Sequence, residues 1–260
     1  MSDLTNSGGL PQSSEGEVMR MLLSPDDNRN QDEPEVAASI GEQMLHMDLQ
    51  ILPRSVRARI RDVCARVSPR NAVLIGGGIG HLSAWLFDCW CTDSGVEENR
   101  PEKYRIVEPG KRFGVIIDRL IRRYGAESWA QVISMNWQEV LAETSSFKAS
   151  NVSLPEIALS SLLPLPIDLF VIDLQEEERI SAASECFELL APGGLMLVLE
   201  PTVPTGDVGD VLEGEEPTPA QSKVQQFNQW IDLIKTANES HSVGFADLSG
   251  GTLVAILKRA

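Results

Sequence analysis

Four glycines near residue 75 form the strongest chemical signal in the sequence. The apolar run Ala72–Ile75 leads into Gly76, Gly77, Gly78 and Gly80, and a helical pattern begins directly afterwards. Because glycine has no side chain, the backbone of such a loop can approach a ligand closely. The helix that follows offers free N–H groups to polar or negative ligand atoms. The pattern therefore predicts a nucleotide-type ligand.

An acidic residue, Glu108, ends the next predicted strand, Tyr104–Val107. Ligands of open α/β sheets bind beyond the carboxyl ends of the strands, where a carboxylate can accept both hydrogens of a ribose diol. The distance from the glycines is longer than usual, and we interpret the polar stretch Thr92–Lys103 as an insertion that lengthens it. The alternative is that Glu108 caps the helix that follows.

The elements that must position these residues alternate regularly along the chain. Short β-type runs separated by helical runs are typical of an α/β fold, in which helices cover both faces of a parallel sheet. The predicted strands are Ala72–Ile75, Tyr104–Val107, Gln131–Ser134, Asp168–Ile172 and Leu195–Leu199, and the helices between them are Leu82–Cys91, Arg112–Tyr124, Trp137–Glu143 and Glu176–Leu190. After a helix at Ala220–Thr236, two β-type runs around Ser249-Gly250-Gly251 predict a closing antiparallel hairpin.

The N-terminal region differs in composition from the rest. Residues 1–50 hold ten Asp or Glu and two Arg, and residues 1–34 are rich in small polar residues, so we expect a disordered acidic tail there. Helices are predicted at Glu35–Leu49 and Pro53–Val67. We interpret the arginines of the second helix as a solvated face; the alternative is a contact surface for an acidic partner or for this protein's own tail.

Charge and composition limit the possible partners. The 260 residues include 22 Lys or Arg and 38 Asp or Glu, a net charge of −16, which opposes binding to nucleic acid or anionic membranes. No apolar run is long enough to span a bilayer, and the first residues do not resemble a signal peptide. The four cysteines are too scattered for a disulfide framework or a zinc site. We expect a cytoplasmic protein that binds neither nucleic acid nor membrane.

Five blocks of the sequence together resemble the class I S-adenosylmethionine-dependent methyltransferases. They are Val73–Gly80, Ile106–Pro109, Ile133–Trp137, Asp168–Asp173 and Leu190–Leu199, in the order of that family. The last third of the chain is most similar to the small-molecule O-methyltransferases of the catechol and caffeoyl-CoA type. The resemblance covers residues 70–260 as the methyltransferase domain, preceded by N-terminal helices at 35–69. It implies a Rossmann-like doubly wound, seven-stranded mixed sheet, a small-molecule acceptor methylated at oxygen, and the homodimer typical of the family.

The resemblance also implies a cofactor site for S-adenosylmethionine. The cofactor-binding residues would be Gly76, Gly77, Gly78, Gly80, Glu108, Asn136, Trp137 and Asp173. Glu108 would bind the ribose hydroxyls. Asn136 would accept the adenine amine, since an amide oxygen can replace the usual Asp. Trp137 would present a backbone N–H and its ring face to the adenine, or else it is an ordinary core residue.

The sequence departs from the pattern of the family in three respects. Leu74 replaces an acid that helps to hold the cofactor's ammonium group. The metal-dependent members bind a divalent cation through an Asp, here Asp173, and an Asp-Asn pair, here Glu200-Pro201, so a metal is in doubt and no metal ligand is assigned. The Lys that acts as base is replaced by Glu176, which leaves Asp173 as the predicted catalytic residue and Glu176 as a second candidate.

Two other functions remain open on the sequence alone. Leu74–Gly78 also resembles the glycine motif of spermidine-synthase-like aminopropyltransferases, although Ile79 and Leu174–Glu176 do not match their acidic positions. The lost metal ligands and the lost Lys would equally suit a non-catalytic interaction protein with the same fold. The acidic segment Glu213–Glu216 is either a solvated loop or an overhang for a cationic substrate, and we interpret His81 as structural.

Overall fold

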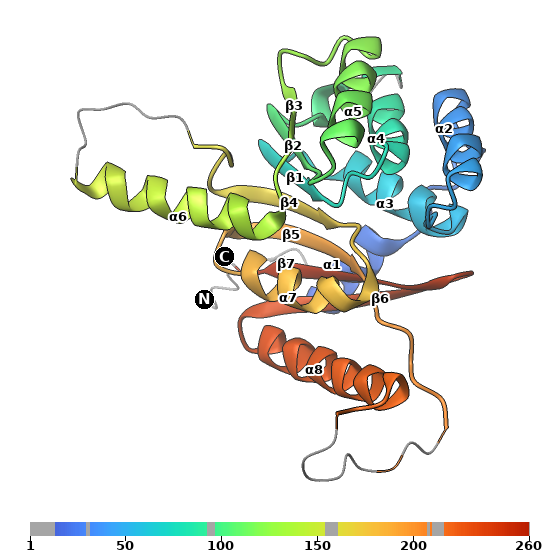
Figure 1. Cartoon of the computed structure of the whole chain (residues 1–260), viewed down its shortest axis with the longest axis vertical. Helices are drawn as coiled ribbons and strands as arrows, with labels where there is room; N and C mark the ends of the chain where they lie inside the picture. Colours follow the sequence, from blue (N-terminus) through green and yellow to red (C-terminus); the bar gives the residue numbers. More distant parts are fainter. Residues whose placement is uncertain are drawn as a thin grey trace, which may run out of the picture.

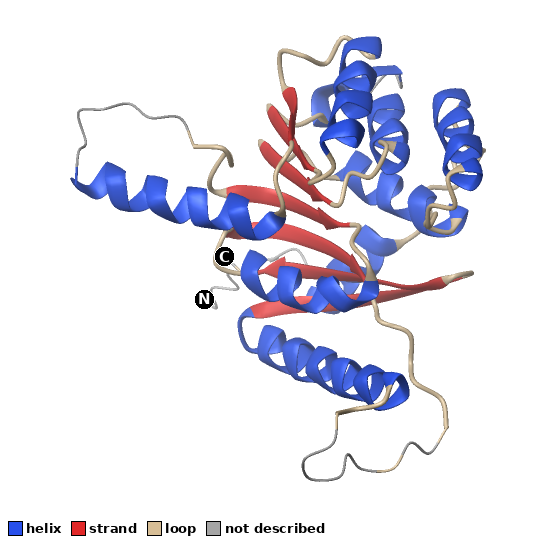
Figure 2. Ribbon diagram, viewed as in Figure 1, coloured by secondary structure: helices blue, strands red, loops and turns tan. Residues whose placement is uncertain are grey.

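Seven strands form one mixed sheet in the order β3-β2-β1-β4-β5-β7-β6 (Figures 1 and 2). The computed structural model describes residues 14–29, 32–92, 97–153, 161–206, 209 and 216–259. The strands are β1 (Asn71–Ile75), β2 (Lys103–Val107), β3 (Ala130–Ile133), β4 (Ile167–Ile172), β5 (Leu190–Leu199), β6 (His241–Leu248) and β7 (Gly251–Lys258). Strands β1 to β5 pair in parallel, whereas β7 is antiparallel to both β5 and β6. The predicted α/β sheet with its C-terminal hairpin is confirmed.

Helices cover both faces of the sheet (Figure 2). One face carries α3 (Arg54–Arg66), α4 (His81–Thr92) and α5 (Lys111–Arg123), and the other carries α6 (Trp137–Ser153), α7 (Glu176–Cys186) and α8 (Pro219–Ser240). Helix α2 (Glu35–His46) packs outside α4, and a short 3₁₀ helix, η1, spans Glu97–Asn99. Side chains of β1 alternate between the two faces of the sheet. Leu74 packs in the core under α4, whereas Val73 and Ile75 pack in the core under α7. Within the described part of the chain, no helix is long and apolar enough to cross a membrane.

The strand order creates a crevice at the carboxyl ends of the central strands β1 and β4. Chain connections leave β1 toward β2 on one side and β4 toward β5 on the other, so the direction of winding reverses between β1 and β4. Ligands of open α/β sheets bind outside the carboxyl ends of the strands at such a switch point. Gly76 follows β1 and Asp173 follows β4, which places both predicted site residues at this crevice.

A first correction concerns the N-terminal segment, where residues Glu15–Leu23 form helix α1. A capping box at Ser14 satisfies the N–H groups that begin the helix. Met19 and Leu23, one turn apart, are buried against β6, where Gly244 leaves room for them; a Cβ at Gly244 would lie 3.0 Å from Leu23 Cδ1. The prediction of disorder is therefore wrong for this helix, because its short apolar stripe finds a partner in the sheet. Residues 1–13 lie outside the described part.

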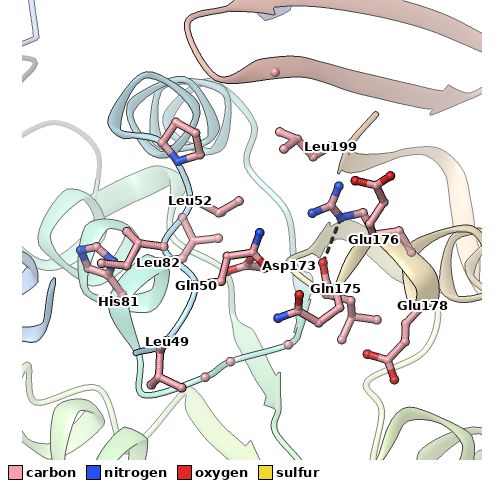
Figure 3. A pocket seen from close by; sticks show the side chains of 18 of the residues that line it. Leu49, Gln50, Leu52, His81, Leu82, Asp173, Gln175, Glu176, Glu178 and Leu199 are labelled. Atoms are coloured by element: carbon pink, nitrogen blue, oxygen red, sulfur yellow. Dashed lines mark hydrogen bonds between the residues drawn. The ribbon is translucent and has the colours of Figure 1, made fainter. Parts of the chain in front are cut away.

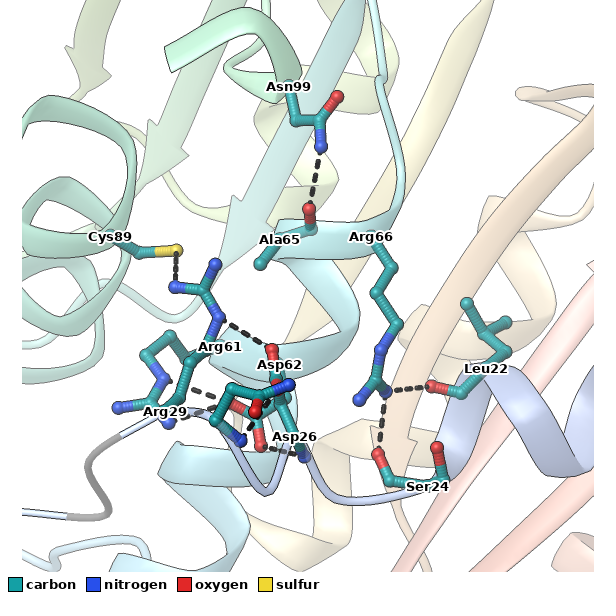
Figure 4. A network of polar contacts seen from close by, with 11 residues as sticks. Leu22, Ser24, Asp26, Arg29, Arg61, Asp62, Ala65, Arg66, Cys89 and Asn99 are labelled. Carbon is teal, nitrogen blue, oxygen red and sulfur yellow. Dashed lines mark hydrogen bonds and ion pairs between the residues drawn. The ribbon is translucent and has the colours of Figure 1, made fainter. Parts of the chain in front are cut away.

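A second correction concerns the arginines of α3, which contact the N-terminal segment. Arg66 Nη1 donates to the carbonyl oxygens of Leu22 and Ser24, at 2.8 and 2.6 Å (Figure 4), and Arg59 donates to the carbonyl oxygen of Leu23. These oxygens lie at the end of α1, where a helix leaves carbonyl groups unsatisfied. The prediction of a solvated face is thus wrong, and the alternative, a contact surface for the protein's own N-terminal segment, is confirmed.

Candidate active site

The loop between β1 and α4 takes backbone conformations that favour glycine. Gly76 and Gly80 have φ angles of +91° and +92°, and Gly78 has +52°. A Cβ at Gly76 would overlap the carbonyl oxygen of Asp173 across the crevice. The Gly76 N–H donates to the carbonyl oxygen of Val107 at 3.0 Å, so the neighbouring strand β2 fixes the loop.

Glu108 approaches the same loop from the end of β2. Its Oε2 accepts a hydrogen bond from the Gly78 N–H at 2.6 Å, and its Oε1 accepts one from the Gly110 N–H at 2.8 Å. The residue is only 6% exposed, and this burial raises the pKa of its carboxyl group, against the two N–H donors. Glu108 therefore contacts both the glycine loop, as the ribose interpretation requires, and the turn that begins α5, as the capping interpretation requires.

A cavity of about 800 Å³ opens beyond the carboxyl ends of β1, β2, β4 and β5. Residues 49–53, between α2 and α3, form one wall, and Asp173 to Glu176 with residues 199–203 form the opposite wall (Figure 3). Gly76, Gly77 and Gly78 of the loop line it between these walls together with Glu108, and the turn of the C-terminal hairpin lies at one end. Sequence patterns gave no indication that residues 49–53 would form a wall.

Three of the residues implied by the resemblance do not line this cavity. Asn136 precedes α6, and its Oδ1 accepts the Glu139 N–H at 2.8 Å while its own N–H donates to the Glu139 carboxylate at 3.0 Å. Trp137 is 7% exposed and packs edge-on against Phe170, with ring centroids 6.1 Å apart, so the core interpretation describes it. Gly80, the last glycine of the loop, is also absent from the cavity lining.

The aromatic side chain that does line the cavity is Phe113, from the first turn of α5. Its ring lies close to the turn after Glu108, since a Cβ at Gly110 would lie 3.2 Å from Phe113 Cδ2. Pro109 lines the same part of the cavity. The sequence could have indicated Phe113 as a cavity residue, because this aromatic residue follows Glu108 closely, at the start of the next helix.

Asp173 follows β4 and is half-buried at the cavity wall. Its backbone N–H donates to the carbonyl oxygen of Ile75 at 2.8 Å, which fixes it beside the glycine loop. Desolvation raises the pKa of its carboxyl group to about 7, although the positive charges of Arg179 and Arg57 oppose the shift. A carboxylate with a pKa near neutral pH is suited to accept a proton at neutral pH.

The acids near Asp173 do not form a metal site. Glu200 Oε1 accepts a hydrogen bond from Trp230 Nε1 at 3.2 Å, and Glu176 Oε2 accepts one from the Thr202 hydroxyl at 3.0 Å. Among the residues that the structure describes, no three His, Cys, Asp or Glu side chains are grouped so that they could hold a metal. Pro201 stands where the amide ligand would be, and Glu200 is bound to Trp230, so these residues do not supply a site of two carboxylates and an amide. Of the acidic segment Glu213–Glu216, only its last residue belongs to the described part.

A polar cluster surrounds His81, the first residue of α4. Glu33 Oε1 lies 2.7 Å from His81 Nε2, and it also accepts hydrogen bonds from Arg57 and from Trp85 Nε1. Burial and the charge of Arg57 lower the pKa of His81, which keeps the ring neutral at neutral pH. His81 therefore holds elements together, in agreement with its structural interpretation. Glu33 could not be found from the sequence, because it lies 48 residues before His81.

Comparison with solved structures identifies the fold of this chain, whereas comparison of its sequence with known proteins finds no match. No protein-family model matches the sequence, and no curated protein matches it. Among solved structures, the O-methyltransferase TomG of Streptomyces achromogenes, from tomaymycin synthesis and in complex with S-adenosylmethionine, has a TM-score of 0.58 at 14% identity, covering 88% of this chain and 92% of that chain. An O-methyltransferase of Bacillus cereus with S-adenosylhomocysteine has a TM-score of 0.54 at 14% identity, covering 94% and 96%.

A third structure, from Staphylococcus aureus and provisionally assigned as a caffeoyl-CoA O-methyltransferase, has a TM-score of 0.58 at 15% identity and covers 86% of this chain and 93% of that chain. In all three comparisons the match covers most of both chains. The chain therefore has the class I methyltransferase fold of these O-methyltransferases.

Proposed function

We propose that the protein is an S-adenosylmethionine-dependent methyltransferase that transfers the methyl group to an oxygen of a small molecule. One observation carries the proposal: the Glu108 carboxylate lies on the glycine loop, at the switch point of the sheet and beside the cavity. TomG and the Bacillus cereus enzyme have the same fold and hold S-adenosylmethionine and S-adenosylhomocysteine, respectively.

The cavity residues match the parts of this cofactor. Glu108 accepts the hydrogens of the ribose hydroxyls, for which its two oxygens are already held by backbone N–H groups. Gly76 and Gly78 allow the methionine part to approach the backbone. Phe113 supplies an apolar surface for the adenine in place of Trp137, which is part of the core.

We assign Asp173 as the general base, because it lies at the cavity wall and the pKa of its carboxyl group is about 7. When bound, S-adenosylmethionine supplies a methyl group on a sulfonium, whose sulfur keeps the electron pair as the new oxygen–carbon bond forms. Asp173 takes the proton that the acceptor hydroxyl loses in this step. The walls of the cavity hold the acceptor in line with the methyl group, which is the main source of the rate in such a transfer. No step runs through a metal ion.

Calorimetric titration tests the proposal. The protein is titrated with S-adenosylmethionine, S-adenosylhomocysteine, decarboxylated S-adenosylmethionine and NAD, each with and without magnesium. We expect the first two ligands to bind in preference to the others, with no effect of magnesium. Preference for the decarboxylated form would indicate aminopropyl transfer instead, and a magnesium effect would restore a metal mechanism. If none of the four binds, the fold serves as an interaction module and the proposal is wrong.

A further inference from the structure

Arg179, on α7, is a buried guanidinium at the wall of the cavity. The residue is 7% exposed and lines the cavity together with Asp173 and Glu176. Its Nε donates to the carbonyl oxygen of Leu174 at 2.9 Å. Within the described residues, Nη1 and Nη2 have neither a hydrogen-bond acceptor nor an ion-pair partner within 4.0 Å.

This arrangement leaves most of the donors of the side chain unused. A guanidinium carries five N–H groups in a planar fork, and here the structure uses only the one on Nε. Burial of the group without a direct ion pair is costly, and this desolvation lowers the pKa of Arg179. The hydrogen bond to Leu174 nevertheless fixes the orientation of the fork, so its four remaining N–H groups are held in place at the cavity.

Neighbouring carboxylates do not account for Arg179. Glu176 and Asp173 raise its pKa through their negative charges, yet neither forms an ion pair with it in the structure. Glu176 is bound instead to Thr202. A side chain that served only to neutralise these acids would pair with one of them directly, because a bidentate contact is the strongest arrangement available to a guanidinium and a carboxylate.

We propose that Arg179 binds a carboxylate group of a ligand in the cavity. One of the two molecules that react there must then carry a carboxylate. The planar fork matches a carboxylate in a bidentate contact, which Lys cannot reproduce. The carboxylate has two possible sources, the amino-acid end of S-adenosylmethionine or the acceptor. The choice between these sources depends on the proposed function, whereas the anion site itself does not.

The first experiment tests the anion site without any cofactor. Benzoate is titrated into the full-length protein, and benzamide serves as the neutral planar control. We expect saturable binding of benzoate in the millimolar range, at least tenfold tighter than benzamide, with the preference lost in Arg179→Gln and partly kept in Arg179→Lys. The matched control is Arg119→Gln, an exposed arginine of α5 outside the cavity, which should keep the preference.

The second experiment identifies the source by repeating the titration with the cofactor site filled. If the carboxylate comes from the cofactor, S-adenosylmethionine abolishes benzoate binding and its decarboxylated form does not. If it comes from the acceptor, benzoate still binds in the presence of S-adenosylmethionine. Equal binding of benzoate and benzamide to the wild-type protein, whether or not Arg179→Gln folds, would overturn the anion site. Absence of any cofactor binding would count against the proposed function alone.

Discussion

Glu33 Oε1 lies 2.7 Å from His81 Nε2, and this contact joins the segment before α2 to the first residue after the glycine loop. Arg57 donates to the same oxygen, and its side chain is only 7% exposed. Glu33 is therefore the counter-ion of a buried guanidinium. Since His81 also lines the cavity, the N-terminal segment is part of the structure that surrounds the site.

Removal of this counter-ion should destabilise the protein strongly. Glu33→Ala leaves Arg57 buried without a carboxylate, and we expect a loss of about 3 kcal/mol in the free energy of unfolding. The urea midpoint measures it, with an unchanged denaturant slope. Asp232→Ala, which breaks an exposed ion pair with Lys235, is the control and should cost less than about 0.5 kcal/mol. Equal losses in the two variants would show that Arg57 does not depend on Glu33.

The second prediction tests whether helix α1 packs against the sheet. Leu23 is 4% exposed and packs near Gly244, so Leu23→Ala should cost about 2–4 kcal/mol in the free energy of unfolding. Met21 lies on the same helix and is 68% exposed, and Met21→Ala should change stability by less than about 0.5 kcal/mol. A helix detached from the sheet would give two variants as stable as the wild-type protein.

The sheet was predictable because each strand carries its own signal. Buried parallel strands are continuous apolar runs, such as Ala72–Ile75, and the intervening helices show their period within a dozen residues. Glycines at 76 and 78 and the acid at 108 were likewise visible, since they follow strands directly. These features depend on neighbouring residues in the chain, which a single sequence does reveal.

Contacts between distant segments were not predictable in the same way. Residues 1–34 are acidic in composition, so the burial of Met19 and Leu23 within them was not expected. That burial depends on Gly244 in β6, more than 200 residues later in the chain. Arg179 has the appearance of an ordinary surface arginine on a charged helix until the cavity beside it is known. Asn136 and Trp137 came from resemblance to a family, and the local bonds of this chain give them other surroundings.

The glycine loop gives a third prediction through two matched substitutions. Gly76→Ala combines a φ of +91° with overlap between the new Cβ and the carbonyl oxygen of Asp173, so the crevice must widen. We expect a loss of more than about 3 kcal/mol in the free energy of unfolding and no cofactor binding. Gly78→Ala has φ +52° and open space around the new Cβ, and should cost about 1–2 kcal/mol. Thermal unfolding and calorimetry measure both; similar costs would contradict the role of the close approach at Gly76.

A fourth prediction concerns the affinity for S-adenosylmethionine. Glu108→Ala removes the carboxylate that would bind the ribose, and the dissociation constant should rise about tenfold, because charge-assisted hydrogen bonds are worth roughly 1.5–3 kcal/mol. Glu102→Ala, an exposed acid before β2, should leave the affinity unchanged. Because burial raises the pKa of Glu108 above its usual value, wild-type affinity should also weaken as the pH falls toward that pKa. An affinity unaffected by Glu108→Ala would mean that the ribose binds elsewhere.

The last prediction follows from the pKa of Asp173, about 7, which burial raises from 3.8. The base form is the carboxylate, so kcat/KM for methyl transfer should rise with pH below about 7 and become constant above it. In the protein without acceptor, the carboxyl carbon of Asp173 should titrate with the same midpoint by ¹³C NMR, and Asp173→Asn should remove that signal. Asp173→Asn should also abolish the pH dependence and lower the rate by about 10²–10⁴-fold.

The exposed acid Glu188 provides the control for this prediction, and Glu188→Gln should alter neither the rate nor its pH dependence. A midpoint near 4 for Asp173, with a pH-dependent rate retained in Asp173→Asn, would assign the base to another residue.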